Sequence, residues 1–291
     1  TGPSPESFLK CENKYLSRLE QSEVIPECTP RFDGFDPNDP DIIEKTQLDY
    51  SFWIKPVSAF SGHLGFEINS DVEFEQALAK IKRRKNLFAQ PYEYLEEQMD
   101  LPEDIDRAGK KTFVAEKIIG GRQCTVEGFV FQSEVGFHGI IDSLRYPRRM
   151  SFSRYQYPSK LPRPIKERLY EKSAKIIRHT GYDNGSFNIE FFWDKKDDRI
   201  WLLEVNTRIS QSHCDLFKMV DGELSHKIIL DLATGQYPSL PHRQGRYKVA
   251  GKLFLRSFKN GTITKVPASK KIKALEKQFG AKIHFTLKEG M

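Results

Sequence analysis

The sequence predicts an α+β fold in which most strands pair antiparallel. Runs of β-branched and aromatic residues follow one another with short polar turns between them, which is the pattern of hairpins. Helical patterns separate these groups of strands, in the order of the α+β class. The chain has 291 residues, 38% of them apolar, with 21 Phe and 11 Tyr. This is enough apolar surface for two or three subdomains that share a cleft.

The first third of the chain predicts two short strands between two helices. Its elements are a helix at 8–21, a loop rich in Asp and Pro at 31–41, a strand at 50–55, a loop of small residues at 58–65, a strand at 66–69 and a helix from 70 to about 84. Pro26 and Pro30 interrupt the chain after the first helix. Ser70 and Glu73 have the spacing of a capping box, which predicts the start of the second helix.

The remainder predicts hairpins and three more helices. Its elements are strands at 86–90, 112–119, 123–131 and 134–143, a helix at 164–179, strands at 186–193 and 199–205, a helix at 221–234, a strand near 248–258, a helix at 269–279 and a strand at 281–287. A turn near Gln132 and Ser133 joins two of the strands. Gly181 and Gly235 follow helical patterns, where glycine favours a left-handed cap.

Composition argues against several classes of protein. No run of 18 apolar residues occurs and the first residues lack the pattern of a signal peptide, so we expect a cytoplasmic protein that does not enter a membrane. The four cysteines have no CxxC spacing, which favours reduced thiols. The net charge is +6, but 46 basic residues are mixed with 40 acidic ones, and the run at 82–85 ends a predicted helix. We therefore expect no nucleic-acid partner. Because the first residue is Thr, we also expect an upstream part.

The most informative segment is NIEFFWDKKDDRIWLLEVNTR, read as a hairpin about Asp197. Glu190 then lies opposite Glu204, and Asn188 opposite Asn206. Directly opposed side chains have Cβ atoms roughly 4.5 to 5.5 Å apart, close enough for two carboxylates to share a hard cation. The alternative is a surface hairpin whose acids are merely solvated.

Residues that follow the second carboxylate extend the same face of the hairpin. Asn206 adds a neutral oxygen ligand and Arg208 adds a cation, each by the strand period of two. Phe191, Trp201 and Leu203 are expected to bury the other face. This pattern predicts a Mg²⁺ site next to an anion.

Two further segments suit a nucleotide, although each also has an ordinary interpretation. In FWIKPVSAFSGHLGF a buried strand ends near Lys55, and the loop 58–65 offers N–H groups at the scale of a phosphate. The loop is neither a Walker A sequence nor GxGxxG, and a solvated lysine is an equal interpretation. In TFVAEKIIGGRQCTVEGFVF, residues 116–119 offer backbone groups and apolar side chains to an adenine ring, or form an ordinary strand and turn.

In this order, the three segments resemble the ATP-grasp superfamily, which includes biotin carboxylase, D-alanine–D-alanine ligase and carboxylate–amine ligases. The resemblance implies two α+β subdomains with mostly antiparallel sheets that clasp the nucleotide. The implied divisions are an N-terminal helix and loop at 1–45, a small subdomain at 46–118, a large subdomain at 119–240 and a C-terminal α+β segment at 241–291. It further implies that an N-terminal pre-ATP-grasp domain belongs upstream of residue 1.

The resemblance also implies roles for individual residues. Those implied to bind the nucleotide are Lys14, Lys55, Ser61, Gly62, His63, Glu116, Lys117, Ile119 and Gln123. Glu190, Glu204 and Asn206 match the magnesium ligands, and Arg208 matches the arginine near the transferred phosphoryl group. Two positions depart from the pattern. Gln123 stands where many members have a Glu that binds ribose, and Ser212 precedes His213 where biotin carboxylase has a Glu.

The implied function is an ATP-dependent ligase. It activates a substrate carboxylate as an acyl phosphate for attack by an amine or a thiol, and releases ADP and phosphate. The implied cofactors are ATP and Mg²⁺, with Mn²⁺ as an alternative metal, and the partners are a small carboxylate and an amine acceptor. Whether the protein forms a homodimer is left open by the sequence. The alternatives are a biotin-carboxylase-like enzyme that uses carboxyphosphate and a noncatalytic ATP-binding module.

Other polar residues have no assigned role at this stage. Cys214 beside His213 is expected to be a buried structural thiol rather than a nucleophile. The dense arginines Arg145, Arg148, Arg149 and Arg154 are read as one loop, which either binds an anionic substrate or is solvated.

Overall fold

The computed structural model describes residues 2–39, 41–58, 64–83 and 112–291. Ser61, Gly62 and His63, and the strand predicted at 86–90, lie outside the described residues. The α+β class is confirmed, because the strand pairs of both sheets are antiparallel. The chain divides into two compact units, Thr1–Leu253 and Phe254–Met291. In the described part of the chain, no helix is both long and apolar enough to cross a membrane.

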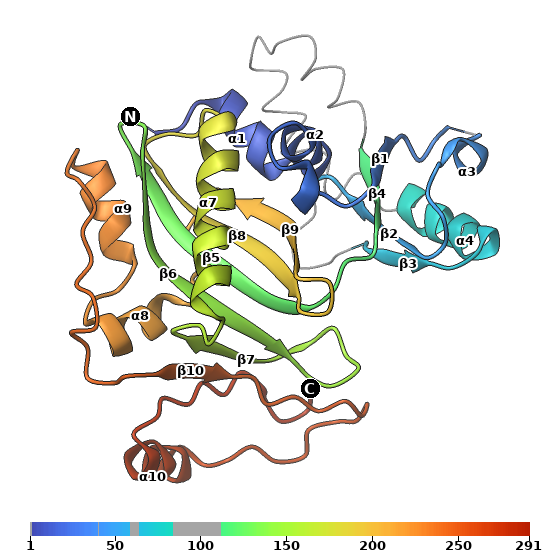
Figure 1. The fold of residues 1–291 in the computed structure, drawn as a ribbon. Coiled ribbons are helices and arrows are strands. Elements are labelled where there is room, and N and C mark those ends of the chain that lie inside the picture. The colour runs from blue at the N-terminus through green and yellow to red at the C-terminus, as the bar shows by residue number, and fades with distance from the viewer. Residues whose placement is uncertain (1, 40, 59–63, 84–111) are drawn as a thin grey trace. The chain divides into compact units, whose positions relative to one another are not determined.

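The smaller sheet of the first unit has the strand order β1-β4-β2-β3 (Figure 1). Its strands are β1 (Phe32–Phe35), β2 (Phe52–Pro56), β3 (Phe66–Ile68) and β4 (Phe113–Lys117). The short α3 (Ile42–Lys45) and α4 (Asp71–Lys82) belong to the same part of the fold, and apolar residues of α4 pack on the sheet. The Ser70 hydroxyl accepts a hydrogen bond from the N–H of Glu73, as the capping box predicts.

The larger sheet has the order β10-β7-β6-β5-β8-β9. Its strands are β5 (Arg122–Phe131), β6 (Glu134–Arg145), β7 (Phe152–Tyr157), β8 (Gly185–Asp194), β9 (Arg199–Asn206) and β10 (Ala250–Leu253). α7 (Arg163–His179) crosses one face (Figure 1) and buries its apolar side against residues such as Ile140. The next residue, Ile141, packs on the other face with α8 (Cys214–Asp221), because successive strand residues point to opposite faces.

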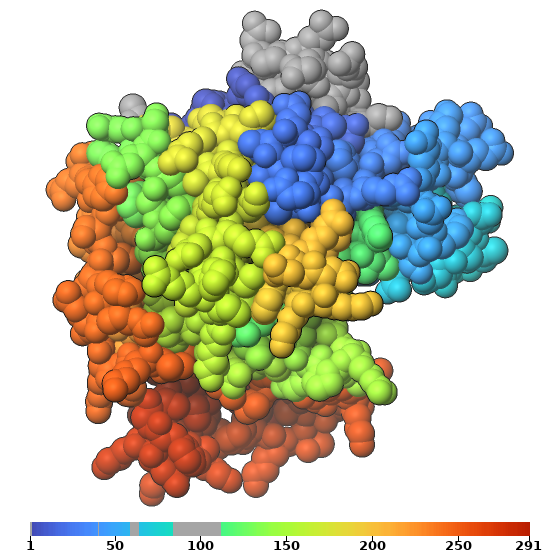
Figure 2. Space-filling view, viewed as in Figure 1, coloured from blue at the N-terminus to red at the C-terminus, as the bar shows by residue number. Residues whose placement is uncertain are grey.

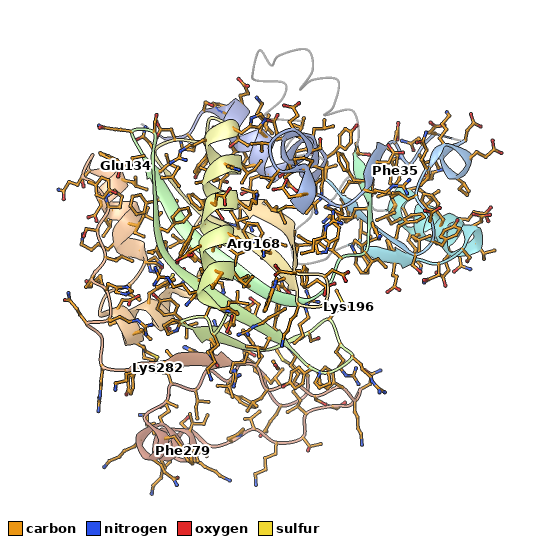
Figure 3. All side chains as sticks on the ribbon, in the orientation of Figure 1. Phe35, Glu134, Arg168, Lys196, Phe279 and Lys282 are labelled. Atoms are coloured by element: carbon orange, nitrogen blue, oxygen red, sulfur yellow. The ribbon has the colours of Figure 1, made fainter. Side chains whose placement is uncertain are left out.

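Polar contacts hold α7 to its neighbours at both ends. Arg168 of α7 binds Asp198 in the β8–β9 turn, 2.9 Å away, and Figure 3 labels Arg168 and the nearby Lys196 of that turn. His179 at the other end lies 3.0 Å from Glu20 of an N-terminal helix. Figure 2 shows the side chains of α7 against those of the N-terminal helices.

The N-terminal helical segment is two helices rather than the single helix predicted at 8–21. α1 (Pro5–Glu12) and α2 (Lys14–Val24) are separated by Asn13, and a short 3₁₀ turn, η1 (Pro26–Cys28), follows. The Asn13 side chain accepts hydrogen bonds from the N–H groups of Tyr15 and Leu16, so it caps a new helix instead of continuing the first. The apolar residues keep their helical spacing across Asn13, so the sequence pattern did not predict the break.

Several boundaries differ from the prediction for local reasons. The segment read as a loop at 31–41 contains strand β1, whose pairing with β4 is long-range. The helix predicted at 221–234 is the shorter α9 (His226–Ala233), and α8 was not predicted; α8 ends before it at Gly222, which adopts a left-handed cap with φ 105°. The turn at Gln132 and Ser133 is confirmed, with both residues at positive φ, as in a two-residue hairpin turn.

The second unit, Phe254–Met291, contains helix α10 (Ser269–Phe279), which matches the predicted range. The strand predicted at 281–287 is wrong, since these residues form no strand. The strand predicted near 248–258 is shortened to β10, which pairs with β7.

Candidate functional site

The hairpin of β8 and β9 places two carboxylates opposite each other. Glu190 pairs with Glu204, and Asn188 pairs with Asn206, in the predicted register. Nearer the turn, a bulge shifts the register by one residue, so Phe191 faces Leu202. The shift makes the expectation for Leu203 wrong: Leu202 is fully buried and Leu203 only half-buried.

The two carboxylates differ in electrostatic environment. Burial, helped by the negative charge of Glu204, raises the pKa of Glu190. Burial also acts to raise the pKa of Glu204, but Lys14 and Lys55 outweigh it, so this pKa is lowered. The Nζ atom of Lys14 lies 3.1 Å from Oε1 of Glu204. One carboxylate of the pair therefore resists ionisation, and an added cation would relieve that cost.

Amide and guanidinium groups continue the same face beyond Glu204. Asn206 donates through Nδ2 to Oδ1 of Asn188 at 3.1 Å, which directs its own Oδ1 toward Arg208. Nη2 of Arg208 donates to that Oδ1 at 3.0 Å. Arg208 is exposed, so its guanidinium is open to a solvent-borne anion.

Glu116 is a buried junction of charges at the end of the smaller sheet. Lys55 donates to its Oε1 at 2.6 Å, and Nε of Arg18 donates to its Oε2 at 3.0 Å. Burial opposes ionisation, yet Arg18 and Lys55 together lower the pKa of Glu116 to about 2. The same burial lowers the pKa of Lys55, against the raising effect of Glu116.

Arg18 is the residue of this region that sequence reasoning missed. It is 2% exposed and also donates from Nη1 and Nη2 to the backbone oxygens of Leu202 and Leu203. Arg18 therefore connects β4 of the smaller sheet with β9 of the larger one. The only signal in the sequence is its helical spacing of four residues from Lys14, which puts both cations on one side of α2.

The segment predicted to hold adenine lies between the two sheets. Lys117 ends β4, and its N–H donates to the backbone oxygen of Arg31 at 2.8 Å. Lys117 is exposed, Ile118 is 42% exposed and Ile119 is half-buried. Apolar side chains are therefore available here to a flat ring.

Gln123 is 3% exposed and has both ends of its amide engaged. Its Nε2 donates to Oε2 of Glu190 at 2.8 Å. Its Oε1 accepts two hydrogen bonds from Arg145, from Nε at 3.0 Å and Nη2 at 2.7 Å. Gln123 thus joins Arg145 to the carboxylate pair.

The prediction that the four dense arginines lie in one loop is wrong. Arg145 ends β6 and is half-buried, and Arg154 lies within β7. Arg148, Arg149 and Arg154 are exposed. Strand β7 was not predicted because Ser153 and Arg154, which follow one another, interrupt the alternation of apolar and polar residues.

His213 lies in a separate buried cluster. Its Nδ1 is 2.7 Å from Oε1 of Glu127, which is fully buried, and His138 is the third member. Burial, together with the charge of His213, lowers the pKa of His138 to about 3. Neighbouring Cys214 is buried, and burial raises its pKa, which suits a structural thiol.

The donor set of the hairpin suits a hard cation. It offers two carboxylates and one amide oxygen, and Mg²⁺ typically binds one or two carboxylates and fills its octahedron with water and phosphate oxygens. Among the described residues, no cluster of three or more His, Cys, Asp or Glu side chains forms an all-protein metal cage. The three side chains of this donor set would fill only part of such an octahedron.

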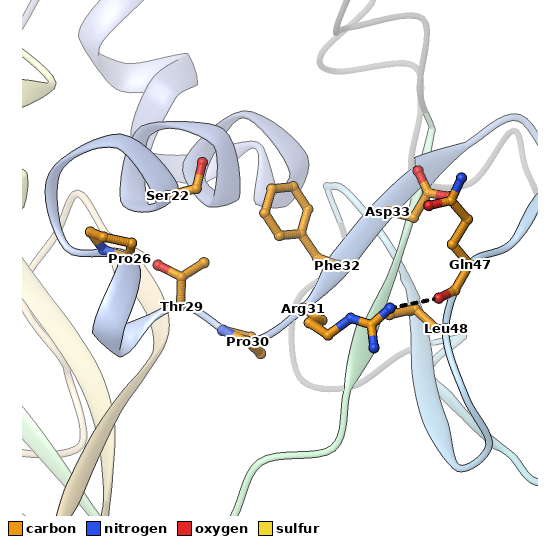
Figure 4. Close-up of a pocket in the computed structure, with 9 residues that line it drawn as sticks. All are labelled: Ser22, Pro26, Thr29, Pro30, Arg31, Phe32, Asp33, Gln47 and Leu48. Carbon is orange, nitrogen blue, oxygen red and sulfur yellow. Dashed lines mark hydrogen bonds between the residues drawn. The ribbon is translucent and has the colours of Figure 1, made fainter.

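A separate cavity of about 450 Å³ lies near the end of α2 and the start of β1 (Figure 4). Its lining includes Phe32 and Arg31, whose Nη2 donates to the backbone oxygen of Gln47 at 3.0 Å. Of the described residues predicted to bind nucleotide or metal, none lines this cavity.

Comparison with known proteins gives partial matches. Residues 156–236 match the carbamoyl-phosphate synthase L chain, ATP binding domain, family. The carbamoyl phosphate synthase large chain of Streptomyces griseus is 31% identical over 112 residues, 38% of this chain and 9% of that protein. The chain thus spans a small part of this relative.

Two solved structures share the fold. An L-amino acid ligase from Bacillus licheniformis has a TM-score of 0.68 at 20% identity, over 92% of this chain and 61% of that one. The biotin carboxylase domain of 2-oxoglutarate carboxylase from Hydrogenobacter thermophilus, in complex with MgADP, ADP and bicarbonate, has a TM-score of 0.57 at 19% identity, over 84% and 50%. The family match over residues 156–236 and the fold shared with these two structures agree with the resemblance of the chain to the ATP-grasp superfamily.

Proposed function

We propose that the protein is an ATP-dependent ligase that phosphorylates a substrate carboxylate and transfers the acyl group to an amine, with a thiol as the alternative acceptor. The observation that carries the proposal is the pair Glu190 and Glu204 on one hairpin face, with Lys14 beside it and Arg208 exposed two residues past Asn206. The carboxylates and Lys14 would hold a metal-bound polyphosphate, and Arg208 would bind the phosphoryl group that is transferred.

Each residue has a role in positioning charge. Glu190, Glu204 and the oxygen of Asn206 would hold Mg²⁺, which supplies neutralisation of phosphate oxygens when bound. Lys14 and Lys55 neutralise phosphate oxygens from the side of α2 and β2. Arg208 holds the phosphoryl group that passes to the substrate carboxylate.

The chemistry consists of two displacements. A carboxylate oxygen of the substrate attacks the γ-phosphorus of ATP, the bond to the bridging oxygen breaks, and ADP leaves. The amine then attacks the acyl carbon, phosphate leaves, and the amine loses a proton to solvent. The protein contributes mainly orientation and charge stabilisation.

The remaining assignments belong to the same proposal. Glu116 orients Lys55 by their 2.6 Å hydrogen bond, and residues 117–119 contact adenine. The divisions at 1–45, 46–118, 119–240 and 241–291, an upstream pre-ATP-grasp domain and a homodimer are retained as proposals. A cytoplasmic location is proposed on the four free cysteines, all buried.

The test is a screen of the full-length protein against pairs of amino acids and small acids. We expect ATP-dependent phosphate release that requires both a carboxylate and an amine, with a product whose mass is that of the pair minus water. Phosphate release that is indifferent to every acceptor, with no coupled product, would contradict a ligase.

A further inference from the structure

Arg145 is half-buried and makes several contacts, whereas Arg148, Arg149 and Arg154 are exposed. Besides its two hydrogen bonds to Gln123, its Nη1 donates to the backbone oxygen of Met150 at 3.1 Å. The guanidinium carbon also lies 5.1 Å from the ring centre of Phe152 and 5.7 Å from that of Phe192. Such a group is fixed in place and is poorly suited to capture a mobile ligand.

The guanidinium determines which end of the Gln123 amide faces the carboxylates. Arginine has only donors, so the group of Gln123 that faces it must be the oxygen. The amide nitrogen then points to Glu190. Turning the amide around would place NH₂ against the guanidinium and a carbonyl oxygen against the carboxylate, which are two repulsive contacts.

The strand register makes this arrangement local and rigid. Arg145, Gln123 and Glu190 come from three adjacent strands, β6, β5 and β8. Gln123 pairs with Phe192, two residues from Glu190 on the same face. Oε2 of Glu190 accepts a hydrogen bond from Gln123, which fixes the orientation of the carboxylate. Its other oxygen, Oε1, has no hydrogen-bond partner among the residues described.

We propose that Arg145, acting through Gln123, positions the Glu190 carboxylate for the metal. The inference rests on the proposed function and assigns both residues a role behind the metal ligand. Gln123 then serves Glu190 rather than the ribose. Outer groups that orient a metal ligand typically change metal affinity by about 10- to 100-fold when they are removed.

The test measures Mn²⁺ affinity by electron paramagnetic resonance, in the presence of saturating ADP, for the parent and four variants. The variants are Arg145→Ala, Gln123→Ala, the double variant and Arg154→Ala, an exposed arginine on the next strand that serves as the control. ADP affinity without metal, measured by fluorescence titration, and far-ultraviolet circular dichroism are recorded for each.

We expect each single variant to lose about tenfold or more in Mn²⁺ affinity, with metal-free ADP affinity within about twofold of the parent. The double variant should lose no more than the larger single loss, because both residues act through one contact. Arg154→Ala should match the parent.

Other outcomes overturn the inference in distinguishable ways. Single variants with parental Mn²⁺ affinity would show that Glu190 needs no support, and losses that multiply in the double variant would show that the two residues act separately. A parallel loss of metal-free ADP affinity would make Arg145 a nucleotide ligand. A folded parent that holds no Mn²⁺ with ADP would remove the proposed function as well.

Discussion

At the scale of single residues, the hairpin carboxylates are the most sharply determined feature. A strand period of two and one assumed turn were enough to place Glu190 opposite Glu204, and the structure has that register. The bulge beside Glu190 was not predictable, because nothing in the local pattern shows which residue of a strand lacks a partner. Arg18 was missed for a related reason, since its partner Glu116 is 98 residues away in sequence.

Changing Glu204 to Gln should weaken Mg-ATP binding and leave the fold intact. The amide has nearly the same shape but removes the charge that faces the cation and Lys14. Isothermal titration with Mg-ATP measures the loss. Asp197→Asn, an exposed change in the turn of the same hairpin, is the control. Equal affinity in Glu204→Gln and its control would remove the hairpin from the site.

Arg208→Lys should separate turnover from binding. A guanidinium can hold two oxygens of a phosphoryl group, whereas lysine offers a point charge. We expect ATP affinity within a few-fold of the parent and a loss of about 100- to 1,000-fold in kcat, the typical effect of one well-placed electrostatic contact. Steady-state kinetics with a substrate from the ligase screen measure both. A parallel loss of affinity and kcat would make Arg208 a ground-state ligand.

At the scale of secondary-structure elements, the sequence predicted the elements better than their ends. The helix at 269–279 and the β5–β6 and β8–β9 hairpins were predicted from periodicity and turn residues. The division at Asn13 and the cap at Gly222 were missed, because a cap interrupts a helix without interrupting its apolar spacing. The contact between the two sheets could not be predicted from the sequence, because it is made by the buried hydrogen bonds of Arg18.

The junction at Glu116 predicts how stability depends on pH. Its folded pKa is about 2, below the ordinary value of 4.5, so its stabilising effect is complete above pH 4.5 and is lost as the pH falls toward 2. The parent should therefore be more stable than Glu116→Gln at pH 7, and this difference should shrink between pH 4.5 and 2. Urea denaturation across that range measures it. A difference that does not change with pH would show that the carboxylate contributes no charge to the fold.

At the scale of the whole molecule, the charge is unevenly distributed. Residues 254–291 contain nine Lys and Arg residues and only two Asp and Glu residues, although the whole chain carries +6. The candidate site in Thr1–Leu253 therefore depends on individual cations such as Lys14, Lys55 and Arg208 rather than on a general positive field. Composition alone could not locate the site, because the net charge reports mainly on the other unit.

The central claim is that the folded chain binds Mg-ATP through the carboxylate pair, and thermal unfolding with Mg-ATP, with ATP and EDTA, and with Mg²⁺ alone tests it most directly. At 100 times its dissociation constant, a ligand that binds only the folded state stabilises it by about 2.7 kcal/mol. The account predicts a rise in Tm of several degrees with Mg-ATP, at roughly 2 to 4 °C per kcal/mol for a chain of this size, and a much smaller rise when EDTA removes the metal. A Tm unmoved by millimolar Mg-ATP, or raised equally with EDTA present, would contradict it.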